Sequence, residues 1–260
     1  MNTPHRPEAL FADFEPISLD ALNAKAAMLE RLDNKYVVQA PVLAAAAAEF
    51  ARHFDVLEID GQRAFTYETC YFDDAERRHH HDHHQGRRQR MKVRVRRYVE
   101  AGLCFLEVKL KDKRGITVKK RMPYDAAKAG QLDDAAMAHV RHCHEALYGK
   151  PFDRELEPVL RMRYRRATLV AREGGERMTI DSDIRFLAGD DGFGPPPGVF
   201  ILETKSAHGH GLADTILRRH HQHPTNGCSK YCVGMSVTGA VQKFNRFRPA
   251  LRKLGALAAA

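Results

Sequence analysis

Long hydrophobic runs are missing from this sequence. No stretch of 18 or more apolar residues occurs, and the longest one, Val42 to Ala48, is too short and too rich in alanine to cross a bilayer. The first residues, Met1 to His5, are soon followed by acidic residues and lead into no apolar core, so no secretory signal is expected. These absences predict a cytoplasmic protein without a transmembrane segment and leave room for a membrane-bound partner.

Cysteine is sparse and catalytic fingerprints are lacking. The five cysteines are an odd, scattered set, which favours reduced thiols in the cytosol. Cys228 and Cys232 could meet on one helical turn, but no further ligand stands near them at metal-site spacing, so packed or surface thiols are favoured. The sequence contains no Walker loop, no Rossmann glycine pattern and no Gly-x-Ser-x-Gly elbow.

What the sequence does have is an excess of positive charge on a globular composition. Its 260 residues are 43% hydrophobic and 29% charged, which suits one domain over residues 1–260. Forty-two Lys and Arg face thirty-three Asp and Glu, which gives a formal net charge of +9. An excess of this size favours an anionic partner such as phosphate, nucleic acid or a membrane surface.

Alternating residues and turn signals predict eight strands in two groups, with helices between and around them. Arg90 to Glu100 and Leu103 to Lys111 alternate strictly, and Ala101-Gly102 between them is typical of a hairpin turn. Regular hairpins with few parallel crossovers indicate an α+β fold built on an antiparallel barrel or saddle. The expected strands are 31–38, 64–73, 90–100, 103–111, 115–124, 158–172, 176–186 and 198–205, and the expected helices are 17–30, 41–54, 125–148 and 212–254, the last broken near 224–227.

Basic residues gather on one face of several predicted strands, because residues two apart in a strand point the same way. A single strand of this kind is explained by a sheet with one wet face. Five such strands whose polar faces are mostly Arg and Lys indicate a positive wall that needs an anion. Aromatic residues do not interleave with the basic ones, which disfavours single-stranded nucleic acid. The shared faces are Lys92, Arg94, Arg96 and Tyr98; Glu107, Lys109 and Lys111; Lys119 and Arg121; Arg177, Thr179, Asp181 and Asp183; and Glu203 and Lys205.

The acidic residues among these bases have different expected roles. Glu203 lies in an apolar strand, where a carboxylate is costly unless it is paired or bound to metal. A metal site for Mg²⁺ or Mn²⁺ and a salt bridge to Lys205 or an arginine remain equally open for it. A pairing role is favoured for Glu107. Asp181 and Asp183 are interpreted as residues that end a strand.

The most unusual segment is the histidine-rich stretch within Arg77 to Arg90. His79 to His84, with Asp82 among them, holds five histidines in six residues, a composition that can bind metal. It lies between two predicted strands and is too polar to pack. A mobile loop with adventitious metal affinity is therefore favoured over a specific metal site.

Nine short motifs in sequence resemble the catalytic domain of the vacuolar transporter chaperone (VTC) polyphosphate polymerases, a branch of the triphosphate tunnel metalloenzyme, or CYTH-like, superfamily. The resemblance covers about Glu30 to Gly234, so the core would be about 30–235 and a C-terminal helical segment about 236–256. The motifs are Arg31-Leu32-Asp33-Asn34-Lys35-Tyr36, Tyr71-Phe72-Asp73, Lys92-Val93-Arg94-Val95-Arg96-Arg97-Tyr98, Glu107-Val108-Lys109, Lys119-Lys120-Arg121, Tyr164-Arg165-Arg166-Ala167, Arg177-Met178-Thr179-Ile180-Asp181, Leu202-Glu203-Thr204-Lys205 and Ser229-Lys230-Tyr231-Cys232-Val233-Gly234.

The resemblance implies a closed, eight-stranded antiparallel tunnel that binds ATP or another nucleoside triphosphate together with polyphosphate. The γ-phosphoryl of ATP would pass to the end of the growing chain with Mn²⁺ or Mg²⁺ as cofactor, which makes the protein a phosphotransferase. Matched by position, the bases at the reacting phosphates are Arg94, Arg96, Lys109, Arg166, Arg177 and Lys230; the expected substrate-binding residues are Lys35, Lys119, Arg121, Glu107 and Lys205; and the metal ligand is Glu203.

One departure from the wider superfamily shifts the expected activity. Hydrolases and cyclases of the superfamily begin with Glu-x-Glu-x-Lys, whereas this chain has Arg31-x-Asp33-x-Lys35, with one acid. This difference favours a polymerase over a hydrolase. The alternatives are a triphosphate hydrolase of the same fold and a non-catalytic module that binds polyphosphate or inositol phosphates, and only the enzymes should need a divalent metal.

Overall fold

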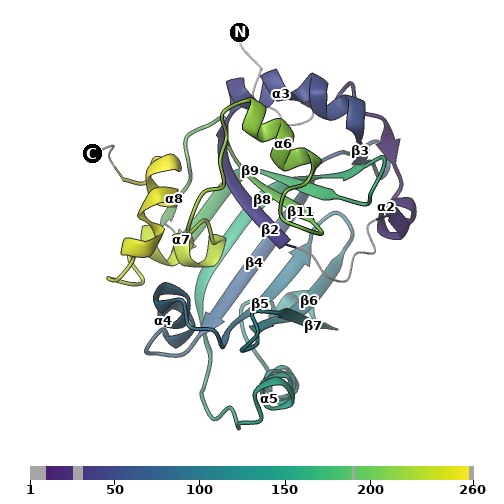
Figure 1. The fold of residues 1–260 in the computed structure, drawn as a ribbon. Coiled ribbons are helices and arrows are strands. Elements are labelled where there is room, and N and C mark those ends of the chain that lie inside the picture. The colour runs from purple at the N-terminus through teal and green to yellow at the C-terminus, as the bar shows by residue number, and fades with distance from the viewer. Residues whose placement is uncertain (1–9, 26–31, 189–190, 258–260) are drawn as a thin grey trace.

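The computed structural model describes residues 10–25, 32–188 and 191–257 and confirms the α+β class (Figure 1). Eight strands follow one another across a large sheet, and each is antiparallel to its neighbours. They correspond to the eight strands that alternation predicts. In order across the sheet they are β2 (Leu32–Gln39), β11 (Val199–Ser206), β9 (Arg177–Ala188), β8 (Glu157–Ala171), β4 (Phe65–Asp73), β5 (Arg90–Tyr98), β6 (Leu103–Lys111) and β7 (Thr117–Pro123).

Three short strands extend this sheet and were not predicted. β1 (Pro16–Ile17) pairs in parallel with β3 (Phe54–Leu57), which in turn pairs with β8. β10 (Asp191–Phe193) pairs with β9. Strands of two to four residues carry too little alternation to be recognised from sequence. The part of the expected helix 17–30 that is seen is α2 (Leu19–Lys25), and residues 26–31, with Arg31 of the first motif, lie outside the described residues.

Closure of the sheet into a barrel is not confirmed. β2 and β7 are the two ends of the strand order, and they are not hydrogen-bonded to each other in the described parts of the chain. The sheet is nevertheless strongly curved. This curvature brings Lys109 of β6 near enough to Lys35 of β2 and Glu203 of β11 for their charges to act on its pKa. Side chains from distant parts of the strand order therefore meet across its inner face.

Helices cover the outer, apolar face of the sheet (Figure 1). α3 (Ala40–His53) begins with Pro41 in its first turn and packs beside α6 (Leu212–Arg219) on β8, β9 and β11. α5 (Asp134–Tyr148) follows a single 3-10 turn (Ala126–Lys128), and Asp133 caps it by accepting the Ala136 N–H at 3.0 Å. The outer strand faces are thus the buried hydrophobic core.

The inner face has a second, apolar half that the C-terminal helices cover. α7 (Lys230–Val237), the 3-10 turn Asn245–Phe247 and α8 (Arg248–Lys253) pack there. The expected break between 212 and 254 is confirmed, since α6 and α7 are separate helices. A bulge between β8 and β9 exchanges the faces of β9: Asp183, with φ of 50°, is exposed, and Ile184 points to the cluster under α7. The prediction that Asp183 shares a face with Asp181 is therefore wrong.

The histidine-rich segment is a packed helix, so the prediction of a mobile loop is wrong. α4 (Arg78–Gln85) buries His79 and His80. The carboxylate of Asp73 accepts the backbone N–H of His79 at 3.0 Å and that of His80 at 3.1 Å, and also the Tyr231 hydroxyl at 2.5 Å. The Asp73 carboxylate therefore caps α4 and also bonds to Tyr231 of α7, which links the two helices. No group of three or more metal-ligating side chains is found within the described ranges.

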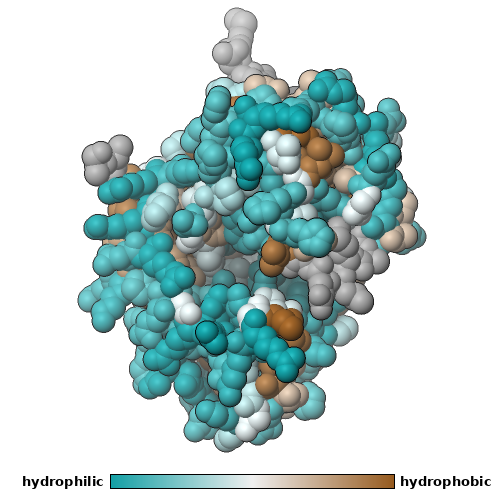
Figure 2. Space-filling model, in the orientation of Figure 1, coloured by the Kyte–Doolittle hydropathy of each residue, from teal (hydrophilic) through white to brown (hydrophobic). Residues whose placement is uncertain are grey.

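The structure also places the cysteines and the surface side chains. All five cysteines are buried free thiols, which confirms the packed-thiol interpretation of Cys228 and Cys232. Among the helices of the described chain, none combines the length and the apolarity that a membrane crossing requires. Figure 2 shows a predominantly hydrophilic face on which hydrophobic side chains form only small, separate areas.

Candidate functional site

The polar half of the inner face brings together most of the residues that the sequence singled out. Strands from both ends of the sheet and the first residue of α7 contribute to it. We call this set the polar face. Its members are Lys35 (β2), Lys92, Arg94 and Arg96 (β5), Glu107 and Lys109 (β6), Lys119 (β7), Arg166 (β8), Asp181 (β9), Glu203 and Lys205 (β11) and Lys230 (α7).

Glu107 is one acidic anchor of the polar face, and its predicted pairing role is confirmed. Only 1% of its side chain is exposed. Its Oε2 accepts from Arg94 Nε at 2.6 Å and lies 3.8 Å from Arg96 Nη1, and its Oε1 contacts Lys119. Burial by itself would raise the pKa of Glu107, but Arg94 and then Arg96 hold it well below its ordinary range.

Asp181 is a second anchor, which sequence reasoning missed. It is fully buried, and Arg166 binds it as a fork, with Nε 2.6 Å from Oδ1 and Nη2 2.9 Å from Oδ2. Lys230 contacts Oδ2 from the start of α7. Despite burial, these two cations lower the pKa of Asp181 to about 2. The interpretation of Asp181 as a strand end is wrong, because β9 continues to Ala188.

Glu203 is the third carboxylate, and lysines rather than arginines flank it. Its Oε1 lies 3.2 Å from Lys205 Nζ and 3.6 Å from Lys35 Nζ, its register partner on β2. Although burial opposes it, Lys205 and then Lys35 lower the pKa of Glu203 well below its ordinary range. Burial, against the attraction of Glu203, lowers the pKa of Lys205 to about 8. The salt-bridge interpretation of Glu203 is thus confirmed.

Lys92 belongs to the polar face although it was not among the expected site residues. Its Nζ donates to Ser229 Oγ at 2.9 Å, next to Lys230, and its register partner is Lys109. Burial, aided by the like charges of Lys109 and Lys35, lowers the pKa of Lys92 to about 8. Lys109 itself is exposed, so solvent reaches this part of the face. The alternation that placed Lys92 beside Arg94 was the signal available in the sequence.

Three tyrosines lie beneath the arginines. The Arg166 guanidinium is 5.1 Å from the ring centre of Tyr67 and 5.3 Å from that of Tyr164, and Arg94 is 5.8 Å from that of Tyr71. Such cation–π contacts fix guanidinium planes without neutralising them. Tyr71 and Tyr164 are buried, so these rings support the cations and are not available for stacking on bases.

Two expected residues lie at the margin. Arg121 of β7 is exposed, with its guanidinium 4.9 Å from the centre of the Phe105 ring. Arg177 of β9 is the register partner of Lys205 at the end of the strand, and its Nη2 lies 3.5 Å from Asn23 Oδ1.

The donor set suits a divalent metal that arrives with its substrate. Both ion pairs of Glu203 in the described residues use Oε1, which leaves Oε2 for a hard cation such as Mg²⁺ or Mn²⁺. No cluster of three protein ligands accompanies Glu203 within those residues. The remaining oxygens would therefore have to come from phosphate and water, the usual arrangement for magnesium.

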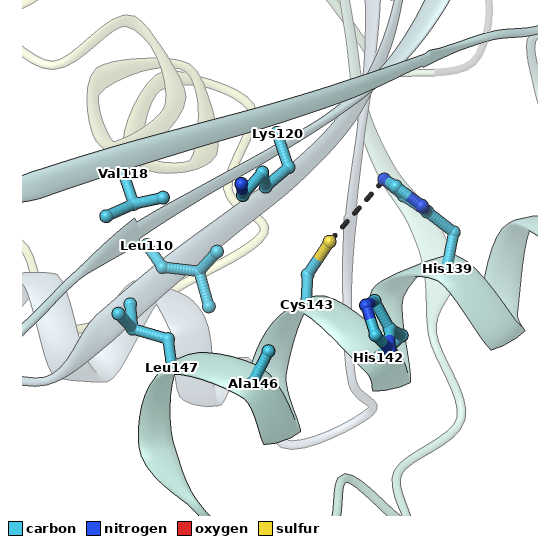
Figure 3. Close-up of a pocket in the computed structure, with 8 residues that line it drawn as sticks. All are labelled: Leu110, Val118, Lys120, His139, His142, Cys143, Ala146 and Leu147. Carbon is cyan, nitrogen blue, oxygen red and sulfur yellow. Dashed lines mark hydrogen bonds between the residues drawn. The ribbon is translucent and has the colours of Figure 1, made fainter.

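A separate hollow of about 410 Å³ lies on the other side of the sheet, between α5 and β6–β7 (Figure 3). Cys143 Sγ lies 3.5 Å from His139 Nε2, while His142 is turned away from the thiol. Burial raises the pKa of the Cys143 thiol and lowers that of the His139 imidazole, so both are neutral near pH 7 and the thiol is not activated. Leu110, Val118, Lys120, Ala146 and Leu147 line the rest of the hollow.

The geometry agrees with a comparison against protein families. The family model described as the VTC domain matches residues 30–238, which is most of the chain. The chain belongs to the VTC domain family. No curated protein matches it significantly.

Solved structures share the fold of this VTC domain. A putative adenylate cyclase from Bacillus halodurans superposes with a TM-score of 0.50 and 12% identity, covering 76% of this chain and 95% of that chain. A putative adenylyl cyclase from Hippeastrum, described as having a dominant triphosphatase activity, gives a TM-score of 0.46 and 16% identity over 84% of this chain and 100% of that chain. At these identities, the first of these likenesses shows a shared fold only.

Proposed function

We propose that this VTC domain is a metal-dependent polyphosphate polymerase that transfers the γ-phosphoryl group of ATP to the end of a polyphosphate chain. The observation that carries the proposal is the charge balance of the polar face, where cations from six strands and α7 outnumber Glu107, Asp181 and Glu203. Such an excess on one concave face is offset by a substrate with many negative charges in a row.

The arginines and lysines have complementary roles in this proposal. Arg94 and Arg166 are held by their carboxylates and tyrosines, so their remaining N–H groups can grip phosphate oxygens as planar forks. Lys205 and Lys92, whose pKa values burial lowers to about 8, act as point charges that a phosphate chain would stabilise. Positioning and charge neutralisation supply most of the catalysis of phosphoryl transfer.

No protein nucleophile is required. A terminal phosphate oxygen of the chain attacks the γ-phosphorus of ATP, a new P–O–P bond forms, and the bond to the β-phosphate breaks so that ADP leaves. A divalent ion held by Glu203 would neutralise charge on the transferring phosphates. Lys35, Lys205 and Lys230 surround that carboxylate and would keep the reacting phosphates in line.

The test is to incubate the purified protein with ATP and Mn²⁺ and to assay polyphosphate and free phosphate separately. Polyphosphate should form, and Glu203→Gln should lower its rate roughly a hundredfold, because a metal ligand at the transferring phosphate contributes several kcal/mol. Glu145→Gln, which changes an exposed carboxylate on α5, should leave the rate unchanged. Omission of the metal should stop synthesis.

Other outcomes identify the alternatives. Free phosphate without polyphosphate would mean a triphosphate hydrolase. Tight, metal-independent binding of polyphosphate without turnover would mean a binding module. Either result rejects the polymerase.

A further inference from the structure

The basic rows of the polar face continue past its edge. In the antiparallel pairing of β5 with β6, Lys92 lies opposite Lys109, and Arg90 lies opposite Lys111 one step further out. Residues two apart on a strand share a face, so Arg90 and Lys111 extend the rows of Lys92 and Lys109. Both are partly exposed, so solvent also reaches this outer pair.

This outer pair forms part of a hollow of about 430 Å³. Its lining consists of Arg88, Arg90, Lys111, Lys113 and Arg114, with Gly115 as the remaining residue. No acidic residue lines it. We call these five cations the basic mouth.

Two carboxylates near the basic mouth, those of Asp112 and Asp82, act on the charges of Lys111 and Arg90 and also have partners outside the mouth. Asp112 accepts the Ile116 N–H at 2.8 Å and so closes the β6–β7 turn, and Asp82 pairs with Arg87 at 3.3 Å. Gly115, with φ of 88°, allows this tight turn. The turn thereby presents Lys113 and Arg114 to solvent.

The backbone of the basic mouth is held in place by α5. The Tyr148 hydroxyl lies 3.0 Å from the carbonyl oxygen of Arg90 and 2.9 Å from that of Lys111, across the first rung of the β5–β6 ladder. The two strand ends that carry Arg90 and Lys111 are therefore held side by side. Burial, then Arg246, lowers the pKa of Arg90, and burial, then Arg90, lowers the pKa of Lys111.

We propose that the basic mouth is a second anion site, which binds phosphate units of a polyphosphate chain that extends beyond the polar face. The inference rests on the proposed function for the identity of the chain, and it adds a binding site for the part of the chain that lies outside the polar face. A linear polyanion fits because the cations follow one strand pair outward in a row. Nucleic acid fits less well, because no aromatic side chain lines the hollow to stack on bases.

The experiment compares two triple variants with equal loss of charge. The test variant carries Arg88→Ala, Lys113→Ala and Arg114→Ala, all exposed positions, and the control carries Arg141→Ala, Arg248→Ala and Arg252→Ala, which are exposed elsewhere. Binding of tripolyphosphate and of medium-chain polyphosphate is measured by calorimetry without ATP, and melting curves check the fold. The test variant should lose about tenfold in affinity for the chain, with a shallower salt dependence, and should keep its affinity for tripolyphosphate. The control should keep both affinities.

Three results would overturn the inference. One is an unchanged chain affinity in the test variant, and another is an equal loss for tripolyphosphate. The third is an equal loss for a single-stranded oligonucleotide, which would make the mouth a general polyanion surface. A protein that binds the chain with the predicted pattern but makes no polyphosphate would refute the polymerase and leave the second site standing.

Discussion

Two regions of the polar face bury charge in opposite ways. Around Glu107 and Asp181, each carboxylate is saturated by at least two cations, and two arginines are locked by short hydrogen bonds. Around Glu203, the groups nearby are lysines, and the pKa of Lys205 is lowered to about 8. The first region is held by short hydrogen bonds from arginines, whereas in the second region two lysines contact the carboxylate at 3.2 and 3.6 Å.

This difference implies different roles for the ion pairs of Glu107 and Asp181 and for those of Glu203. A buried ion pair with full hydrogen bonding holds the strands in register and orients guanidinium groups, and its loss is costly because the partner charge stays buried. A cluster of incompletely paired lysines gains most when an anion enters, because the anion relieves their mutual repulsion. Glu107 and Asp181 therefore hold the site in shape, and the lysines around Glu203 are the groups that would gain most from a bound anionic substrate.

The largest expected effect comes from breaking an anchor. Asp181→Asn should lower the free energy of unfolding by about 3 kcal/mol, because Arg166 and Lys230 would remain buried without their carboxylate. Denaturant titration measures the change. Asp183→Asn, two residues along and exposed, should change stability by less than about 0.5 kcal/mol. Equal effects at both positions would show that Asp181 is not an anchor.

A second prediction concerns α4, where polar side chains are buried without charge. Burial lowers the pKa of His83, and also those of His80 and His84, below the ordinary value of 6.5. The unfolded chain then binds more protons than the folded one below about pH 6.5, so stability falls on acidification, by up to about 1.4 kcal/mol per pH unit for His83 alone. Melting temperatures between about pH 7.5 and 5 should fall. In His83→Gln the fall should be shallower, and an unchanged slope would argue against this cause.

The smallest effect is on ligand affinity at alkaline pH. Lys92 and Lys205 have pKa values of about 8, and their protonated forms favour an anion. Affinity for tripolyphosphate should be complete below about pH 7 and should fall by tenfold or more as the pH rises to about 9.5, since each lysine must regain a proton on binding. Calorimetry across this range measures it. Lys92→Arg keeps its charge at alkaline pH, so its affinity should fall less steeply with pH. If the affinity of the unmodified protein did not change with pH, the two lysines would not bind the anion in the way proposed.

Several features of the fold could be predicted from the sequence alone. Period-two alternation on β5, β6 and β11 fixed the strands and the side that carries Arg94, Lys109 and Glu203, because side-chain direction in a strand depends only on local geometry. Proline and hairpin turns marked the boundaries in the same way. The eight long strands and the basic face follow from such short-range rules.

Tertiary structure decided the rest, because pairing across strands depends on contacts that are distant in sequence. The partners of Asp181 come from β8 and α7, and the bulge beside it turns Asp183 to solvent, which no local pattern shows. α4 is buried because the Asp73 carboxylate and Tyr231 meet it from other elements, although its own composition is polar. The sheet curves without confirmed closure for the same reason: which strand edges meet is settled by packing over the whole molecule and not by any one strand.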